Sequence, residues 1–371
     1  MTLTTILGML LGLGLLVGGA QLLVRGASAL ALTLGISPLV VGLTVVAYGT
    51  SAPELAVSIR SALSNQTGVV LGNVIGSNTL NILLILGVAA IIRPLLVAPQ
   101  LLRIDAPILV VLTGLLWFFI SDGVLARYEG VIFSALLLGY TYFVVTQSRK
   151  ETKAVQEQYA DEFKDTATPT GKWHWNVLFL LTGLVLLAVG AEFLTGGAVT
   201  LAKALGVSDV VIGMTVVAIG TTTPELAACL VASSRGEGDI AAGNAIGSCI
   251  FNIVAVLGFG AIVAPQGIVA DAQALSFGVP AIFAVACVTL PIFYVGGRIM
   301  RWEGAILLLC FAAYTAYLVL SATGSPHLGA FSQMMWWVAL PVIAAVILIG
   351  VVHEIRRGKG PGDMEKPTVS R

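Results

Sequence analysis

Charged residues are scarce in this sequence, and their scarcity limits the class of protein. Only 10% of the 371 residues are Asp, Glu, Lys or Arg, whereas 57% are apolar, and the mean hydropathy is +0.98. Soluble domains carry roughly 25% charged residues, so the composition excludes a soluble enzyme. The net charge is +0, so the chain also lacks the excess of basic residues that is typical of nucleic-acid-binding proteins. The chain is therefore predicted to be an integral protein of a lipid bilayer.

Cysteine and histidine are also sparse. The three histidines and four cysteines show no metal-ligand spacing, and the cysteines lie in apolar segments at Cys229, Cys249, Cys287 and Cys310. Buried thiols of this kind act as small apolar side chains. Zinc and copper use His and Cys ligands, so neither metal is expected, and no cofactor is predicted.

Apolar runs of about 20 residues, the length that crosses a bilayer, recur along the chain. Eleven membrane helices are predicted, at 6–24, 37–59, 69–92, 104–121, 128–147, 175–195, 208–232, 240–263, 272–295, 303–321 and 334–352. A polar linker at 148–174 separates the fifth from the sixth. With the N-terminus outside, 16 of the 19 Lys and Arg residues lie on the inner side. The positive-inside rule then predicts that the linker and the C-terminus are cytoplasmic.

A gapless internal repeat divides the chain into two halves. Residues 37–87 and 208–258 are related by an offset of 171 and share 22 identities in 51 positions. The predicted units are a first half at 1–147, the linker at 148–174, a second half at 175–321, and an extra helix with a basic tail at 322–371. Five helices per half is an odd number, so the second half must enter the membrane from the opposite side. The predicted fold is all-α, with two inverted five-helix repeats forming a ten-helix core plus one extra C-terminal helix.

Each repeat places one glutamate deep in an apolar span, at Glu54 and at Glu225. A charge at that depth costs at least ~2.5–3.5 kcal/mol, and the apolar spans offer no deep basic residue as a partner. A protonated glutamate that donates a hydrogen bond is an alternative interpretation. Pro53 and Pro224, which precede the acids, are predicted to break the helices and to expose backbone carbonyl groups in mid-membrane.

Hydroxyl and amide side chains surround both predicted breaks. The hydroxyl residues at the breaks are Thr50, Ser51, Thr221 and Thr222. Each following helix carries a stripe of Asn, Ser and Asn spaced by four. We interpret the first members, Asn73 and Asn244, as interhelical hydrogen-bond partners. For the remaining members we favour ion ligation; they are Ser77, Asn81, Ser248 and Asn252.

Together the two halves offer an all-oxygen site with a formal charge of −2. Calcium takes 6–8 oxygen ligands in irregular geometry, whereas magnesium gives up its water reluctantly. This set of oxygen ligands therefore favours a hard cation, with Ca²⁺ as the best match and Na⁺ as its competitor. Anionic substrates would be repelled.

The motifs that carry this chemistry resemble a known family. GTSAPE and GTTTPE, each followed by GNxIGS and Asn-Ile, are similar to the two alpha-repeats of the cation/Ca²⁺ exchanger superfamily, and especially to its prokaryotic sodium/calcium exchanger branch. The resemblance covers residues 6 to about 320. It implies three Na⁺ sites around one Ca²⁺ site. The ligands that it implies are the side chains of Glu54, Glu225, Thr50, Ser51, Thr221, Thr222, Ser77, Ser248, Asn81 and Asn252 and the carbonyl groups of Ala47 and Ala218. Asn252 stands where potassium-dependent members carry Asp, which argues against K⁺ co-transport.

These observations predict a secondary antiporter of the cell membrane that exchanges Na⁺ for Ca²⁺ by alternating access. An empty site at −2 is too costly to occlude, whereas either ion neutralises it. A proton-coupled Ca²⁺/cation exchanger is the nearest alternative, and a passive cation channel is an alternative of another class. An enzyme is not predicted, because no His or metal triad accompanies the acids. The glycine-rich first and sixth helices resemble the sliding gates of the family, although close packing explains their glycines equally well.

Overall fold

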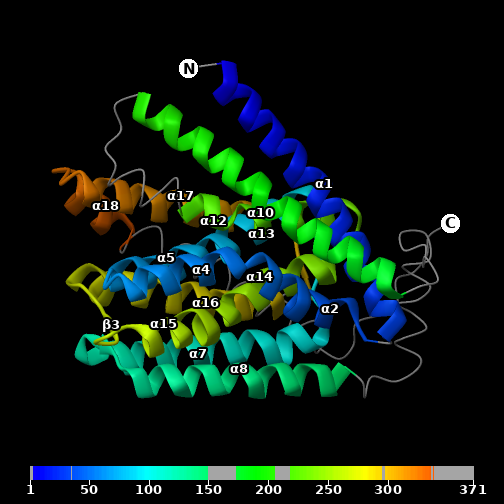
Figure 1. Ribbon diagram of the computed structural model, residues 1–371. Helices are drawn as coiled ribbons and strands as arrows, with labels where there is room; N and C mark the ends of the chain where they lie inside the picture. Colours follow the sequence, from blue (N-terminus) through cyan, green and yellow to red (C-terminus); the bar gives the residue numbers. More distant parts are fainter. Residues whose placement is uncertain are drawn as a thin grey trace.

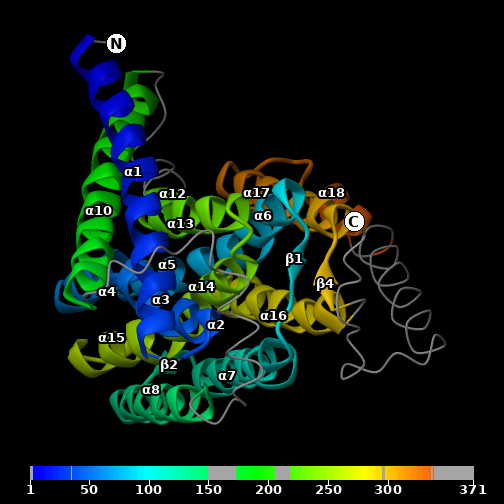
Figure 2. The same cartoon turned by 90° about the vertical axis from the view of Figure 1, so that its right-hand side faces the viewer.

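The computed structural model describes residues 3–34, 36–148, 173–204, 218–294, 297–335 and 337, which are almost entirely helical. Most of the helices lie along a common direction, with α8 (Arg127–Ser148) at one side of the stack in Figure 1. The two longest helices, α1 (Leu3–Leu34) and α10 (Trp173–Ala204), cross this direction obliquely. Figure 2 shows them side by side at the edge of the molecule.

The helices of the two halves follow the same order. In the first half, α1 is followed by α2 (Pro38–Val41), η1 (Gly42–Val46), α3 (Ala47–Thr50), α4 (Ala52–Leu63), α5 (Thr67–Thr79), η2 (Leu80–Ile85), α6 (Leu86–Ile92), η3 (Leu101–Asp105), α7 (Ala106–Phe119), η4 (Ile120–Asp122) and α8. In the second half, α10 is followed by α12 (Ala218–Thr221), α13 (Thr223–Ser234), α14 (Gly238–Phe251), η6 (Asn252–Leu257), α15 (Gly258–Val263), η7 (Ala274–Gly278), α16 (Val279–Tyr294), α17 (Arg301–Ala322) and α18 (Leu328–Met334).

Most of these helices belong to segments that are long enough to cross a membrane. Eight spans of the described residues are long and apolar enough to cross a bilayer, and a ninth joins Pro38–Thr50 to Ala52–Leu63 across a 44° bend. The prediction of a multi-span, all-α membrane protein is thereby confirmed. Residues 149–172, residues 208–217 of the seventh predicted helix, and most of the eleventh at 334–352 lie outside the described residues.

Four strands of two residues each connect the halves, and the sequence did not predict them. β1 (Leu95–Leu96) pairs antiparallel with β4 (Arg298–Ile299), a contact visible in Figure 2, and β2 (Val124–Leu125) pairs antiparallel with β3 (Ile268–Val269). β1 corresponds to β3 in the repeat, and β2 corresponds to β4. Each pair therefore joins one half to the other, and the pair β1–β4 is equivalent to the pair β3–β2 under the repeat.

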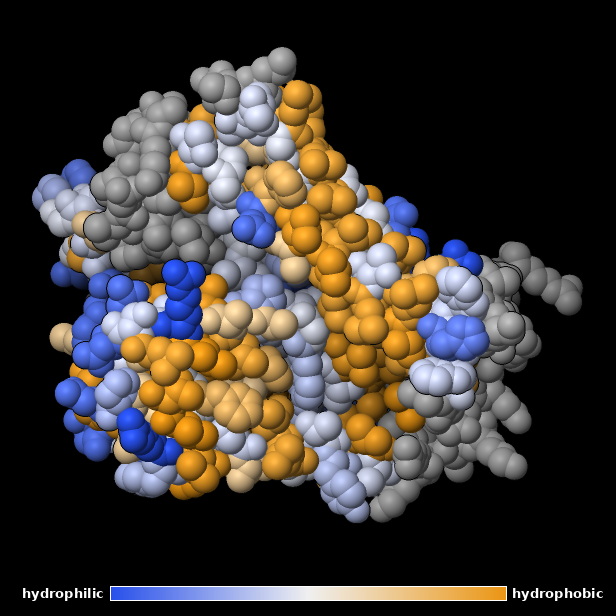
Figure 3. Space-filling view, in the orientation of Figure 1, coloured by the Kyte–Doolittle hydropathy of each residue, from blue (hydrophilic) through white to orange (hydrophobic). Residues whose placement is uncertain are grey.

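Two spans form the centre of the molecule. The most apolar windows of Thr67–Ile92 and Gly238–Val263 are 72% and 83% buried, whereas the other straight spans range from 6% to 39%. Apolar side chains on the outer helices cover much of the surface in Figure 3, and hydrophilic residues gather mainly toward its left and right edges. This distribution suits a protein whose helices run from edge to edge through lipid.

Helices α1 and α10 pack backbone against backbone at glycine. A Cβ atom built on Gly183 would lie 2.5 Å from the Leu23 nitrogen, and one built on Gly190 would lie 2.8 Å from the Gly12 carbonyl oxygen. Only glycine permits this approach. Gly14 has no heavy atom within 4 Å of such a Cβ. Close packing therefore explains part of the glycine-rich face, and other glycines on it face open space.

The predicted spans 6–24 and 175–195 are too short, because both helices have 32 residues. The apolar run of the first one stops at Arg25, but the helix continues because its next residue packs against α10. A Cβ atom on Gly26 would lie 2.6 Å from the Leu180 nitrogen. At 1.5 Å per residue each helix exceeds the ~30 Å hydrocarbon thickness, which fits their oblique course in Figure 1.

The turn before α14 attaches the second half to α1. Ser28 on α1 is hydrogen-bonded to the carboxyl group of Glu237, which is only 2% exposed. Burial raises the pKa of Glu237 to about 7, although the Ser28 hydroxyl and the positive charge of Arg235 both lower it. The Ser28 hydroxyl also lies 2.9 Å from the Val24 carbonyl oxygen, to which it can donate.

Replacing Gly183 by alanine tests the close approach of the two long helices. We expect Gly183→Ala to lower the apparent Tm in detergent, because overpacking a tight contact costs about 1–3 kcal/mol. Gly14→Ala is the matched control on the partner helix, since its Cβ meets no neighbouring atom. Equal Tm values for both variants would contradict this packing.

A second prediction concerns the pH dependence of stability. Because the pKa of Glu237 is raised from 4.5 to about 7 in the folded protein, its bound proton stabilises the fold fully below pH 4.5. That contribution is lost as the pH rises through 7. Glu237→Gln stays neutral, so its apparent Tm relative to wild type should increase between about pH 5 and about pH 8. A Tm difference that is constant with pH would show that Glu237 does not titrate in this range.

Candidate cation site

The second and seventh predicted helices are both interrupted beside their glutamate. Ser51, with φ −84° and ψ 7°, separates α3 from α4, and Thr222, with φ −85° and ψ −1°, separates α12 from α13. Pro53 and Pro224 lie in the first turn of the new helices, where a missing N–H leaves no carbonyl unpaired. The predicted breaks are present, two residues before each proline, but they do not leave the Ala47 carbonyl group exposed, because the Ser51 nitrogen donates to it at 3.0 Å.

The two glutamates lie in the first turns of the half-helices that begin at these breaks. Glu54 is 0% exposed and Glu225 is 1% exposed. The positive end of a helix dipole favours a negative charge in its first turn, so each half-helix stabilises its own carboxylate. The two carboxyl groups are close enough to interact electrostatically. The fold therefore concentrates negative charge in its centre.

Hydroxyl groups from each half face the acid of the other half. Ser51 donates a hydrogen bond of 2.8 Å to Oε1 of Glu225. In the opposite direction, the hydroxyls of Thr221 and Thr222 face the carboxyl group of Glu54. Thr50 also faces Glu225. The four hydroxyl residues predicted from the sequence are thus brought to the acids, and the pairing crosses between the repeats.

Asn73 and Asn244 join neighbouring helices, as predicted. Asn73 Nδ2 donates to the Glu54 carbonyl oxygen at 3.3 Å and to Ser58 Oγ at 3.1 Å. Asn244 Nδ2 donates to Cys229 Sγ at 3.2 Å, and its Oδ1 accepts a bond of 3.2 Å from Thr50. These bonds hold the central helices against the half-helices that carry the acids.

Several buried oxygen atoms around the acids have no hydrogen-bond partner among the described residues. Leaving such an atom unpaired costs about 1–3 kcal/mol, so a cluster of them is suited to binding a cation. Seven of the nine unpaired side-chain N and O atoms belong to the candidate ligands. They are Glu54 Oε1 and Oε2, Glu225 Oε2, Asn81 Oδ1 and Nδ2, Ser248 Oγ, and Asn252 Oδ1.

The other candidate ligands have protein partners. Ser77 Oγ lies 3.2 Å from Thr222 Oγ1, so α5 reaches the break in the second half. The Ala47 carbonyl oxygen accepts bonds from the Ser51 nitrogen at 3.0 Å and from Thr50 Oγ1 at 3.3 Å. Ala218 is the first residue of α12, in the position equivalent to Ala47.

Local widening of the helices accompanies the two site asparagines. Asn81 lies in the π-helical segment η2, and Asn252 begins the equivalent segment η6. Segments of this kind occur often at functional sites, because the extra residue per turn redirects side chains. The apolar pattern of a continuous span does not reveal them.

Asn78 is a central residue that the sequence interpretation missed. It is 0% exposed, its Nδ2 donates to the Cys249 carbonyl oxygen at 3.0 Å, and its Oδ1 accepts from Asn252 Nδ2 at 3.0 Å. Asn78 directly follows Ser77 in the GNVIGSN motif, which is a signal of its importance. Its counterpart in the second half is Cys249, so a search for identical repeat residues overlooks it.

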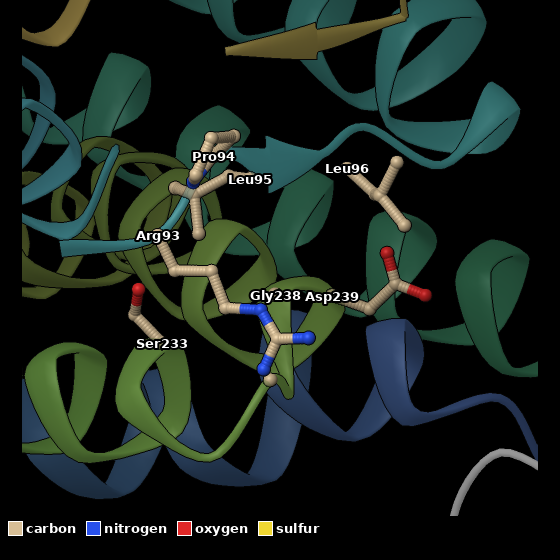
Figure 4. Close-up of a pocket in the computed structure, with 8 residues that line it drawn as sticks. Arg93, Pro94, Leu95, Leu96, Ser233, Gly238 and Asp239 are labelled. Carbon is tan, nitrogen blue, oxygen red and sulfur yellow. The ribbon is translucent and has the colours of Figure 1, made fainter. Parts of the chain in front are cut away.

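The described residues contain no group of three or more His, Cys, Asp and Glu side chains that could hold a metal ion. The site is instead a pair of acids with neutral oxygens. A surface pocket of about 90 Å³ lies elsewhere, where the Arg93 side chain extends along the turn before α14 beside Asp239 (Figure 4). It is smaller than the ~300–1,000 Å³ typical of organic ligand sites, and none of the candidate cation ligands lines it.

Helical spans surrounding two buried acids define a membrane protein that handles cations. The profile of the sodium/calcium exchanger protein family matches residues 4–146 and 175–320, and the chain belongs to this family. It is therefore a cation/Ca²⁺ antiporter, a transporter that uses no cofactor, rather than an enzyme.

Similar proteins match most of the chain. CaxA of Alkalimonas amylolytica is 40% identical over 317 residues, which cover 84% of this chain and 98% of that protein. The sodium/calcium exchanger MaX1 of Methanosarcina acetivorans is 32% identical and covers 84% of this chain and 97% of its own. A solved structure of the sodium-calcium exchanger NCX_Mj superposes with a TM-score of 0.73 at 30% identity, covering 85% of this chain and 99% of that one.

Removing either carboxylate charge tests the cluster as a cation site. We expect wild-type protein in detergent to gain thermal stability with added Ca²⁺, by about 2.7 kcal/mol at a hundredfold excess over Kd. Glu54→Gln and Glu225→Gln should each lose this gain, because one charge no longer balances a divalent ion. Glu192→Gln is the control, since it makes the same change at an exposed position on α10. Full Ca²⁺ stabilisation in either site variant would exclude that carboxylate from the site.

Proposed function

We propose that this chain exchanges Na⁺ for Ca²⁺ by alternating access, with both ions bound at the central acids. The observation that carries the proposal is the cluster of unpaired, buried oxygens around Glu54 and Glu225. The names of MaX1 and NCX_Mj, both sodium/calcium exchangers, support the same ion pair. The proposed ligands are the two glutamates, the four hydroxyl residues at the breaks, Ser77, Ser248, Asn81, Asn252, and the carbonyl groups of Ala47 and Ala218.

Charge balance explains why exchange is obligatory in this proposal. Two ionised carboxylates shielded from water carry an uncompensated charge, and charges at this depth are costly. One Ca²⁺ ion neutralises them, and so do Na⁺ ions. Only an ion-loaded site can then be closed off from water and opened to the opposite side of the membrane. The protein therefore changes between its outward-facing and inward-facing states only with an ion bound.

The hydroxyl contacts favour Na⁺ over H⁺ as the counter-ion. A proton needs only the carboxylate oxygens, whereas Na⁺ needs several oxygen ligands. Ser51 donates to Oε1 of Glu225 and leaves Oε2 unpaired, and the Asn252 amide donates to Asn78 while its own oxygen is unpaired. Free oxygens therefore remain beside the acids after the internal hydrogen bonds are made.

We also infer the orientation of the chain from its basic residues. The turns that contain Arg93 and Arg235, the linker at 148–174 and the C-terminal tail lie on one predicted side of the membrane, which by the positive-inside rule is the cytoplasmic side. The N-terminus then lies outside. We further propose that residues 1–147 and 175–321 form the two halves of the exchanger, on either side of the linker.

Calcium uptake into proteoliposomes tests the exchange itself. We expect sodium-loaded vesicles to take up Ca²⁺ when external Na⁺ is removed. Vesicles with equal Na⁺ on both sides should not, and neither should vesicles that contain Glu54→Gln. Uptake driven by a pH gradient without Na⁺ would replace sodium by protons as the counter-ion. Uptake without any counter-ion would identify a passive channel and overturn the antiport proposal.

A further inference from the structure

A third acid lies inside the membrane-spanning part of the molecule, away from the cation site. Asp105 is 0% exposed and belongs to the span Leu101–Asp122. It is the last residue of the π-helical segment η3 that opens this span. Its printed hydrogen bonds in the described part of the chain involve none of the candidate cation ligands, and the antiport mechanism does not use it. An ionisable residue at such a position suggests a function.

The neighbours of Asp105 are neutral. Tyr140 on α8 donates to its Oδ1 at 3.0 Å, and Gln100 donates to its Oδ2 at 3.3 Å. Both donors are uncharged, so neither contact supplies a positive charge to balance an ionised Asp105. Arg103 in the same segment is exposed. Among the described residues, Tyr140 is the titratable group in contact with Asp105, and Tyr48 interacts in turn with Tyr140.

The equivalent position in the second half has no acid, although the residues that contact Asp105 are kept. Gln100 corresponds to Gln273 at an offset of 173, and Tyr140 and Thr141 correspond to Tyr314 and Thr315 at an offset of 174. The two residues that contact Asp105 are thus kept, whereas Asp105 itself is replaced by Gly278 at the end of the equivalent π-helical segment η7. The fold therefore does not require a carboxyl group at this position, which indicates a role beyond packing.

Two consecutive residues of α8 connect this acid to the cation site. Tyr140 contacts Asp105, and Thr141 Oγ1 lies 2.8 Å from the hydroxyl of Tyr48. Tyr48 belongs to α3, between the candidate ligands Ala47 and Thr50. Its ring stacks on Phe251, next to Asn252, with the ring centroids 4.6 Å apart. A change at Asp105 that moves Tyr140 also moves Thr141, and so acts on the helix break that carries part of the site.

We propose that Asp105 is a proton-binding site in the first half of the molecule, coupled to the cation site through Tyr140, Thr141 and Tyr48. The described conformation holds the proton. Loss of the proton leaves a buried negative charge that only neutral groups face, which disfavours this arrangement and slows the exchange cycle. Transport should therefore decline on the alkaline side. The coupling to transport rests on the proposed function, whereas proton binding does not.

Proton binding is tested without transport. Infrared spectra of Glu54→Gln/Glu225→Gln protein, recorded as the pH is raised, should lose the C=O stretch of a protonated carboxyl group. Adding Asp105→Asn to this background should remove one component of that band from the start and leave the components of other buried acids such as Glu237, while adding Asp122→Asn, an exposed acid at the other end of the span, should leave the whole band. A band that is unchanged by Asp105→Asn would overturn the proposal, whatever the transported ions are.

The coupling is tested by the pH profile of sodium-driven Ca²⁺ uptake, with equal pH on both sides of the vesicle membrane. Wild-type and Asp122→Asn rates should fall by up to roughly tenfold per pH unit beyond the point at which Asp105 loses its proton. Asp105→Asn stays neutral and should keep its rate. Tyr140→Phe preserves the ring and should shift the alkaline decline. Alkaline declines identical to wild type in both Asp105→Asn and Tyr140→Phe would overturn the coupling.

Discussion

Two carboxyl groups in the middle of a membrane protein must have their charge balanced, and the arrangement of the central helices follows from this requirement. Neither Glu54 nor Glu225 has a basic partner among the described residues, so compensation comes from helix N-termini and hydroxyl groups and, in the proposed mechanism, from the transported cation. Both half-helices begin at the break beside their acid, which places the positive end of each helix dipole there. The same breaks would be too costly facing lipid, which accounts for the central, buried position of the site.

The site exists only when both halves are present. Ser51 of the first half bonds to Glu225 of the second, and Ser77 on α5 meets Thr222 in the second half. Away from the site, each short antiparallel strand pair joins one half to the other. The halves are therefore interlocked rather than placed side by side, and a movement of one against the other must change the cation site.

Departures from the repeat mark places where the halves act differently. Asn78 faces Cys249, so the bond to Asn252 has no equivalent in the other half. Glu237 corresponds to Gln66, and Asp105 corresponds to Gly278. Two of these three differences add a buried acid to only one half. Because burial penalises the charged form of an acid, such positions make a nearly symmetric molecule respond to protons in an asymmetric way.

Local signals in the sequence were sufficient for the class of protein, the repeat, the two acids and the helix breaks. Apolar length identifies a membrane span, and a proline disrupts the helix that precedes it, whatever the rest of the molecule does. The hydroxyl residues near the breaks could also be identified, since the PE motifs occur twice. Their number and type required no knowledge of packing.

Tertiary structure decided which groups meet. The sequence could not show that Ser51 donates a hydrogen bond to the glutamate of the other half, because the two residues are 174 positions apart in the chain. It could not give the full length of α1, which continues past Arg25 because Gly26 packs on α10. Nor could it reveal the π-helical segments that carry Asn81 and Asp105. The sequence determined by itself where charge and helix breaks lie, because those depend on residue chemistry, whereas the partners of each charge depend on how the two halves pack.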